Sequence, residues 1–168
     1  MKASRPDLVK RYGVAMWFWN GLPYDARAIT GYMFSRGINQ VKSSSGDHLG
    51  IGGTHQQNKS AGKLFFCKDD ELDQVLFGKT AIPLKTWTYV VLVRDGDQVT
   101  LYLNDHPEPE IDAQVGDNYP AGTEQIFIGG RCDNLFNFEG KINEVAVYNR
   151  PLNAQEVAKH YAASQAPL

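Results

Sequence analysis

Residues 138–152 of the chain read Phe-Glu-Gly-Lys-Ile-Asn-Glu-Val-Ala-Val-Tyr-Asn-Arg-Pro-Leu, and they are the most informative stretch for the fold. After Gly140 the pattern alternates as in a β-strand. The strand must stop at Arg150-Pro151, because the proline ring restricts the backbone and removes a hydrogen-bond donor. A strand this apolar needs sheet on both sides. We therefore expect a β-rich chain in which this segment runs through the interior of a sheet.

A capped helix is predicted directly after this strand. Asn153 and Glu156 have the spacing of a capping box, with Asn as the N-cap. We expect the helix to reach about Ala163 and the last residues, 164–168, to form a tail. Its apolar face should carry Val157, Ala158 and Tyr161.

Short strands separated by turn residues are predicted in the rest of the chain, over residues 12–20, 29–36, 48–53, 63–67, 74–77, 87–94, 98–103 and 124–128. Asp95-Gly96 is a strong hairpin signal between two of them. The connection from Pro107 to Pro120 reads as irregular. Many short strands and one helix indicate an all-β fold, an antiparallel β-sandwich or jelly roll with a short C-terminal helix.

Length and composition limit the classes of protein to consider. The chain has 168 residues, enough for one domain with a real core. Lys plus Arg is 17 against 19 acidic residues, a net charge of −2, which argues against a nucleic-acid partner. The sequence contains no apolar run long enough for a transmembrane segment, and residues 1–7 do not read as a signal peptide. Cys67 and Cys132 are compatible with one disulfide or with two thiols.

Three blocks, in this order, resemble the concanavalin A-like lectin/glucanase superfamily, and specifically bacterial laminin-G-like (LamG) domains. The first is the aromatic strand around Trp17, leading into residues 34–37, Phe-Ser-Arg-Gly. The second is Trp87 with the hairpin that ends in Leu-Tyr-Leu-Asn at 101–104. The third is residues 128–130, Ile-Gly-Gly, followed by 138–152. The resemblance spans residues 12 to about 161 and implies a jelly roll of two antiparallel sheets.

The beginning of the chain departs from this family pattern. The family usually has a β-strand before the first block, whereas eleven residues precede Tyr12 here. We therefore expect residues 1–11 to be a flexible segment or the remnant of a preceding strand, and residues 12–163 to be the LamG-like domain. The chain reads as a module of a longer protein.

The resemblance also raises the question of a structural calcium ion. The family often carries Asp where Asn143 stands, and in related jelly rolls that Asp can bind calcium. Asn offers a neutral carbonyl oxygen, which binds a hard cation less strongly than a carboxylate. The affinity for calcium at Asn143 is thus expected to be lower than with Asp, but a structural calcium ion there stays possible. No other cofactor is expected.

The sequence argues against catalysis. Superfamily members that cleave glucans carry Glu-x-Asp-x-x-Glu, because retaining hydrolysis needs two carboxyls roughly 5–5.5 Å apart. The nearest match is residues 71–76, Glu-Leu-Asp-Gln-Val-Leu, which lacks the third carboxylate and reads as a solvated charged turn. No Gly-x-Ser-x-Gly motif occurs, and the four His residues lack metal-ligand spacing.

Binding is the leading alternative to catalysis. Aromatic faces hold the C–H surfaces of sugars, while Asp, Asn and Arg side chains bond the hydroxyl groups. Trp17 and Trp19 share a strand face; we expect Trp17 to pack between the sheets, and Trp19 to do so or to bind ligand. Trp87 and Tyr102 read as packing residues. A second group of candidates consists of polar residues on or beside loops, namely Arg36, Asp47, His48, Arg131, Asp133 and Asn134.

For Asp133 and Asn134, ordinary turn chemistry is the favoured alternative. The family resemblance, together with these candidate residues, implies a non-catalytic binding module, most simply one that recognises carbohydrate. It would belong to a larger exported protein, extracellular or periplasmic, beside other domains of the parent chain. The competing hypothesis is a domain that contacts a protein surface or acts as a spacer, and a glycoside hydrolase ranks third.

Overall fold

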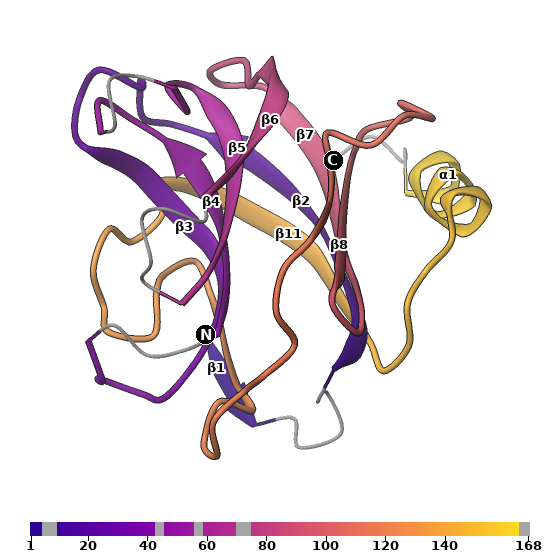
Figure 1. The fold of residues 1–168 in the computed structure, drawn as a ribbon. Helices are drawn as coiled ribbons and strands as arrows, with labels where there is room; N and C mark the ends of the chain where they lie inside the picture. The colour runs from indigo at the N-terminus through magenta and orange to yellow at the C-terminus, as the bar shows by residue number, and fades with distance from the viewer. Residues whose placement is uncertain (5–9, 43–45, 56–58, 70–74, 165–168) are drawn as a thin grey trace.

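Two antiparallel β-sheets packed face to face make up the protein (Figure 1). The computed structural model describes residues 1–4, 10–42, 46–55, 59–69 and 75–164. Sheet A has the strand order β1-β10-β3-β4-β5-β6, and sheet B has the order β11-β2-β7-β8-β9. The predicted antiparallel sandwich with a C-terminal helix is confirmed.

The elements of the sandwich have the following bounds: β1 Lys2–Ser4, β2 Arg11–Asn20, β3 Ile29–Arg36, β4 Asp47–Gly52, β5 Lys63–Lys68, β6 Leu76–Ala81, β7 Trp87–Asp95, β8 Gln98–Leu103, β9 Ile111–Gln114, β10 Gln125–Ile128, β11 Gly140–Tyr148 and α1 Ala154–Ala163. Within the described ranges, no helix has the length and apolar character needed to cross a membrane.

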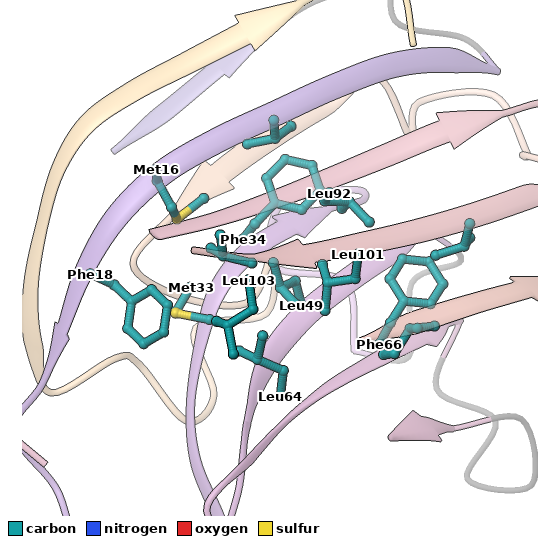
Figure 2. Packing of buried hydrophobic residues seen from close by; sticks show 14 of the residues in the cluster. Met16, Phe18, Met33, Phe34, Leu49, Leu64, Phe66, Leu92, Leu101 and Leu103 are labelled. Carbon is teal, nitrogen blue, oxygen red and sulfur yellow. The ribbon is translucent and has the colours of Figure 1, made fainter. Parts of the chain in front are cut away.

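The main hydrophobic core fills the space between the two sheets (Figure 2). Strand alternation supplies it, since every second side chain of a strand points to the same face. On β2, for example, Tyr12, Val14, Met16 and Phe18 are fully buried in this core. Burying one large apolar side chain contributes about 1.5–3 kcal/mol, so this layer is the main source of stability.

A second apolar layer lies on the outer face of sheet B, beneath α1. There Trp17 stacks on Tyr161 of the helix at a centroid distance of 5.7 Å, and its Nε1 donates to Ser164 Oγ at 3.1 Å. Trp17 is thus buried, but the prediction that it packs between the sheets was wrong. The helix explains why β2 is apolar on both faces.

The sequence suggested that β11 runs through the interior of a sheet. This prediction was wrong, because β11 lies at the edge of sheet B. Its only sheet neighbour among the described strands is β2. The register shifts between Asn143 and Ala146, so that Glu144 adopts a left-handed φ of 50°. Ala146 and Tyr148 on its outer face pack against the apolar layer beneath the helix.

The predicted capping box is present at the start of α1. Asn153 Oδ1 accepts from the Glu156 N–H at 3.0 Å, and Glu156 Oε2 accepts from the Asn153 N–H at 3.0 Å. Hydrogen bonds from Arg150 and from the Asn153 N–H lower the pKa of Glu156 to about 2. Val157 is buried and Tyr161 half-buried as expected, whereas Ala158 is exposed, because the helix contacts sheet B along a narrower stripe than predicted.

Several local predictions need adjustment. Residues 111–114 form β9, although the connection from Pro107 to Pro120 was expected to be irregular. The strand expected at 74–77 is β6, which begins at Leu76. Residues 2–4 pair with β10 as β1, which agrees with the second of the two alternatives given for residues 1–11, the remnant of a preceding strand. Both cysteines are buried thiols and form no disulfide in the described structure. Of the Glu-x-Asp match, residues 71–74 lie outside the described residues.

Candidate functional site

An open pocket of about 390 Å³ lies at the β1–β10 edge of sheet A. We call it the loop pocket, because the connection between β10 and β11 forms much of its wall. Its lining residues are Met1, Lys2, Asn39, Phe127, Ile128, Gly129, Gly130, Arg131, Asn134 and Asn137. Two of the residues predicted to bind ligand, Arg131 and Asn134, are therefore brought together here.

The β10–β11 connection is closed at its base by backbone hydrogen bonds. The Gly129 N–H donates to the Met33 carbonyl at 2.8 Å, and the Phe138 N–H donates to the Gly129 carbonyl at 3.0 Å. Gly129 has a φ of 83°, which favours glycine. A Cβ at Gly130 would lie 2.3 Å from Asn137 Oδ1, so the missing side chain lets the Asn137 amide come close to the backbone.

Arg131 is held in place before any ligand arrives. Its Nε donates to Asp133 Oδ1 at 2.9 Å, and its Nη2 donates to Oδ2 at 2.5 Å. The guanidinium also lies over the ring of Tyr32, 5.3 Å from the centroid. Although burial of Asp133 favours its neutral form, hydrogen bonds from Arg131 and from the Leu135 N–H keep its pKa below the ordinary value. The ion pair neutralises Arg131 and fixes its orientation.

Two amide side chains form the solvent side of the loop pocket. Asn137 Nδ2 donates to Asn134 Oδ1 at 3.0 Å, and both residues are exposed. An amide carries two donors and an acceptor with two lone pairs, so each side chain keeps unused capacity towards a ligand. With Asn39 across the pocket, three amides surround the space. Such a set can bond several hydroxyl groups at once.

Apolar side chains accompany these amides. Phe127 lines the pocket, and it faces outward because its neighbour Ile126 belongs to the core between the sheets. Leu135 and Phe136 are 41% and 37% exposed, on the same connection. Phe136 has a φ of 48°, an uncommon value for a bulky residue. Strained backbone of this kind occurs at binding sites more often than elsewhere.

His48 supports the loop from below and does not line the loop pocket. It is 1% exposed, and its Nδ1 lies 2.8 Å from Ser35 Oγ. The same Oγ accepts from the Cys132 N–H at 3.1 Å. His48 thus fixes the hydroxyl that holds the backbone next to Arg131. We assign it a positioning role.

Arg36 and Asp47 lie inside the sandwich, away from the loop pocket. Asp47 is 0% exposed, and its Oδ2 accepts from Arg94 Nε at 3.2 Å, from Tyr119 Oη at 2.7 Å and from Tyr12 Oη. Arg36, which is 2% exposed, lies over the ring of Tyr119 at 4.3 Å. Both charged groups have internal partners, so we leave them out of the proposed site.

Trp19 lies on the opposite side of the molecule from the outer face of sheet A. It is half-buried on the outer face of sheet B, where Lys141 Nζ sits 5.1 Å from the ring centroid. It pairs across strands with Trp87. Trp19 cannot contribute to the same site as Arg131, because the two are separated by the thickness of the sandwich.

Asn143 lies on β11, opposite Trp17 in register, and is half-buried. Within the described part of the chain, no group of three or more His, Cys, Asp or Glu side chains is placed to hold a metal ion. The residues near Asn143 therefore supply no recognisable set of carboxylate ligands for calcium.

Sequence reasoning did not identify Asn39, Phe127 or Asn137 as site residues. Asn39 follows β3, Phe127 lies on β10 and Asn137 ends the loop, so nothing in local sequence connects them. The available signal was the pair Gly129-Gly130 next to an asparagine-rich loop. Glycine pairs often allow close backbone approach, which predicts a loop fold but not its neighbours.

Comparison with known proteins identifies similar folds. A family model described as "Concanavalin A-like lectin/glucanases superfamily" matches residues 7–158. No curated protein matches the sequence. Among solved structures, the CBM40 of the Ruminococcus gnavus IT-sialidase is 16% identical with a TM-score of 0.68, covering 92% of this chain and 84% of that chain. It has also been solved bound to alpha2,3 sialyllactose.

Two further structures are similar over most of the chain. Domain 4 of AbnA, a GH43 extracellular arabinanase from Geobacillus stearothermophilus in complex with arabinotriose, is 18% identical with a TM-score of 0.64, covering 91% of this chain and 68% of that chain. The native heptameric SAP-like pentraxin from Limulus polyphemus is 16% identical with a TM-score of 0.64, covering 93% of this chain and 71% of that chain. At sequence identities this low, the structural similarity establishes a shared fold and nothing further.

Proposed function

Because the chain belongs to the concanavalin A-like lectin/glucanases superfamily, we propose that it is a non-catalytic carbohydrate-binding module of an exported protein. Two of the similar structures, the sialidase CBM40 and the arabinanase domain, are solved with saccharides bound, which supports this class of ligand. Fold alone does not establish function, so the proposal depends on the chemistry of a site.

The loop pocket is the observation that carries the proposal. It combines three asparagine amides, an oriented arginine and an outward-facing phenylalanine around about 390 Å³. Sugars present hydroxyl groups on their rims and C–H groups on their faces, and amides and aromatic rings complement these two surfaces. A volume of this size falls in the usual range for small-ligand sites.

The ligand should be a neutral sugar. Arg131 already makes two hydrogen bonds to the Asp133 carboxylate, so its charge is compensated within the protein. Binding an acidic sugar there would require breaking this pair, and charge-assisted bonds of this kind are stronger than neutral ones. The neutral amides at the mouth of the pocket do not have this cost.

A glycan array that contains neutral and acidic glycans tests the proposal, with and without calcium. We expect retention of neutral glycans in both conditions. For the glycan that binds best, Asn137→Ala should weaken affinity about two- to tenfold, because a hydrogen bond contributes roughly 0.5–1.5 kcal/mol. The matched control is Asn149→Ala, which removes an equally exposed amide outside the pocket.

Three results would contradict this site. One is the absence of any retained glycan. Another is equal affinity of the Asn137→Ala and Asn149→Ala variants for the bound glycan. The third is loss of binding in Trp19→Ala with Asn137→Ala unaffected, which would move the site to the outer face of sheet B.

Exposed Leu135 and Phe136 favour a second candidate, contact with a protein surface. Two large apolar side chains at a loop tip are more typical of an interaction surface than of plain solvent exposure. In that case Phe136→Ala would abolish binding to the partner while the glycan array stays empty. We prefer sugar binding because most of the functional groups that line the loop pocket beside this tip are amides and other polar groups.

A further inference from the structure

A second pocket, of about 370 Å³, lies on the other side of the sandwich between β11 and the C-terminal half of α1. We call it the helix-side pocket. It is lined by Tyr89, Glu144, Ala146, Tyr148, His160, Ala163 and Ser164. It shares no residue with the loop pocket, and the sugar-binding proposal does not use it.

Small side chains and a β-bulge create this space. Ala15 and Ala146 are register partners on β2 and β11, so two methyl groups stand where larger side chains would fill the gap below the helix. The bulge places Glu144 outside the normal alternation, with a φ of 50°. Bulges re-aim side chains, and here the bulge puts a carboxylate at the rim of the pocket.

Aromatic rings form the walls. Tyr148 and His160 are stacked, with centroids 5.4 Å apart and an interplanar angle of 21°. Tyr148 Oη lies 3.3 Å from His160 Nδ1, which fixes both rings. Tyr89 is held by Trp17 at 5.3 Å and by Tyr161 at 5.8 Å. The negative faces of such rings attract cations within about 6 Å of their centroids.

The charged residues around the pocket, like the aromatic rings, favour a cation. Glu144 is an exposed carboxylate, and none of the described residues that line the pocket is Lys or Arg. Burial, followed by the proximity of Tyr148 and Glu144, raises the pKa of Tyr89 to about 12. The burial that dominates this shift opposes a charge of either sign, so the preference for a cation rests on the Glu144 carboxylate and the aromatic rings.

We propose that the helix-side pocket binds a quaternary ammonium group, with the rings of Tyr89 and Tyr148 around the cation and the Glu144 carboxylate at the rim. Aromatic walls with one carboxylate suit a bulky, weakly hydrated cation better than a metal ion, which needs several oxygen ligands.

Choline is the probe, titrated by isothermal calorimetry against sodium chloride at matched ionic strength. We expect saturable binding with a dissociation constant on the order of 1 mM, because two or three cation–π contacts contribute a few kcal/mol. The neutral isostere 3,3-dimethylbutan-1-ol has the same shape without the charge. It should bind at least about tenfold more weakly, because it loses the cation–π contacts and the attraction to the Glu144 carboxylate.

Glu144→Gln tests the carboxylate without changing the shape or the backbone demand of the bulge. Choline affinity should fall about two- to fivefold, the usual effect of an exposed ion pair, and Glu108→Gln, which removes an exposed charge elsewhere, should leave it unchanged. Unchanged melting temperatures establish that both variants are folded. Failure of choline to saturate, equal binding of the isostere, or full affinity in Glu144→Gln would each overturn the proposal.

A quaternary ammonium group can come from a free metabolite or from a lipid headgroup. Sedimentation with phosphatidylcholine vesicles distinguishes the two sources. Cosedimentation that free choline competes away would identify a membrane surface, whereas binding of choline without cosedimentation would identify a free small molecule. In both outcomes the Glu144→Gln variant must bind more weakly than the unchanged protein.

Discussion

Replacing Arg94 by methionine is expected to lower the free energy of unfolding by about 3–5 kcal/mol, the usual cost of breaking a buried ion pair. Arg94 and Asp47 are both 0% exposed, and Arg94 Nε lies 3.2 Å from Asp47 Oδ2. Asp47 Oδ1 is buried without a hydrogen-bond partner, so this carboxylate already lacks part of its hydration. Removing the arginine leaves its negative charge without its closest counter-charge.

The neighbouring tyrosines cannot replace that counter-charge. Burial and the Asp47 charge raise the pKa of Tyr12, and burial and Asp47 likewise raise the pKa of Tyr119. Both side chains therefore stay neutral and donate hydrogen bonds to the carboxylate. They stabilise the ion pair but bring no positive charge of their own.

Urea denaturation of single and double variants measures this effect. In the Asp47→Leu/Arg94→Met double variant most of the stability should return, because apolar replacement of both partners is often neutral. Lys10→Met breaks an exposed pair with Asp117, whose side chains are 52% and 38% exposed, and should cost about 1 kcal/mol or less. An Arg94→Met protein as stable as Lys10→Met would refute the assignment.

The same cluster shows why Arg36 and Asp47 were predicted to bind ligand. Both lie next to loops, where recognition residues are common. The alternation of side chains along the strands, however, indicates burial. Asp47 shares its strand face with buried Leu49 and Ile51, and Arg94 shares its face with Leu92. Strand alternation in the sequence thus indicates that Asp47 and Arg94 are buried. It does not show that the two side chains meet across the two sheets.

The fold was predictable where the signals are local. The β7–β8 hairpin matches its prediction because Gly96 adopts the positive φ of the turn and the flanking residues strongly favour strands. β9 was missed because its alternation, Ile-Asp-Ala-Gln, covers only four residues within a connection that begins and ends with proline. The prediction for β11 was wrong because apolar residues on both faces show that the faces of a strand are covered, not that another strand pairs with each of its edges.

The candidate site was predictable only in part. Arg131 and Asn134 were candidates because polar residues on loops are frequent ligand contacts, and the structure places both at the loop pocket. Asn39 reaches the loop pocket from the segment after β3, and Phe127 does so through the outward parity of β10. Both contributions depend on the pairing of β10 with β3, a contact between residues about ninety positions apart that no local pattern encodes.

Trp17→Ala is expected to cost about 3–5 kcal/mol, as for other large-to-small changes at buried aromatic residues. Trp17 is 8% exposed and joins β2 to the helix through Tyr161 and through its bond to Ser164. The cavity would lie under α1 at its contact with β2, while Tyr89 and Tyr148 would still contact the helix. We therefore expect the amides of α1 to lose most of their protection from hydrogen exchange, while those of the core strands keep theirs.

Trp19→Ala is the matched comparison, since Trp19 is the same residue type on the same face of β2, two positions further on. It lies beyond the helix and is half-buried, so the cost should be about 1 kcal/mol. Urea denaturation gives both values, and hydrogen exchange locates the loss. Equal costs for the two variants, or intact protection of α1 in Trp17→Ala, would mean that the helix is held by contacts other than Trp17. If both expectations hold, the outer face of sheet B carries two tryptophans with different tasks: Trp17 attaches the helix, and Trp19 stays accessible beside it.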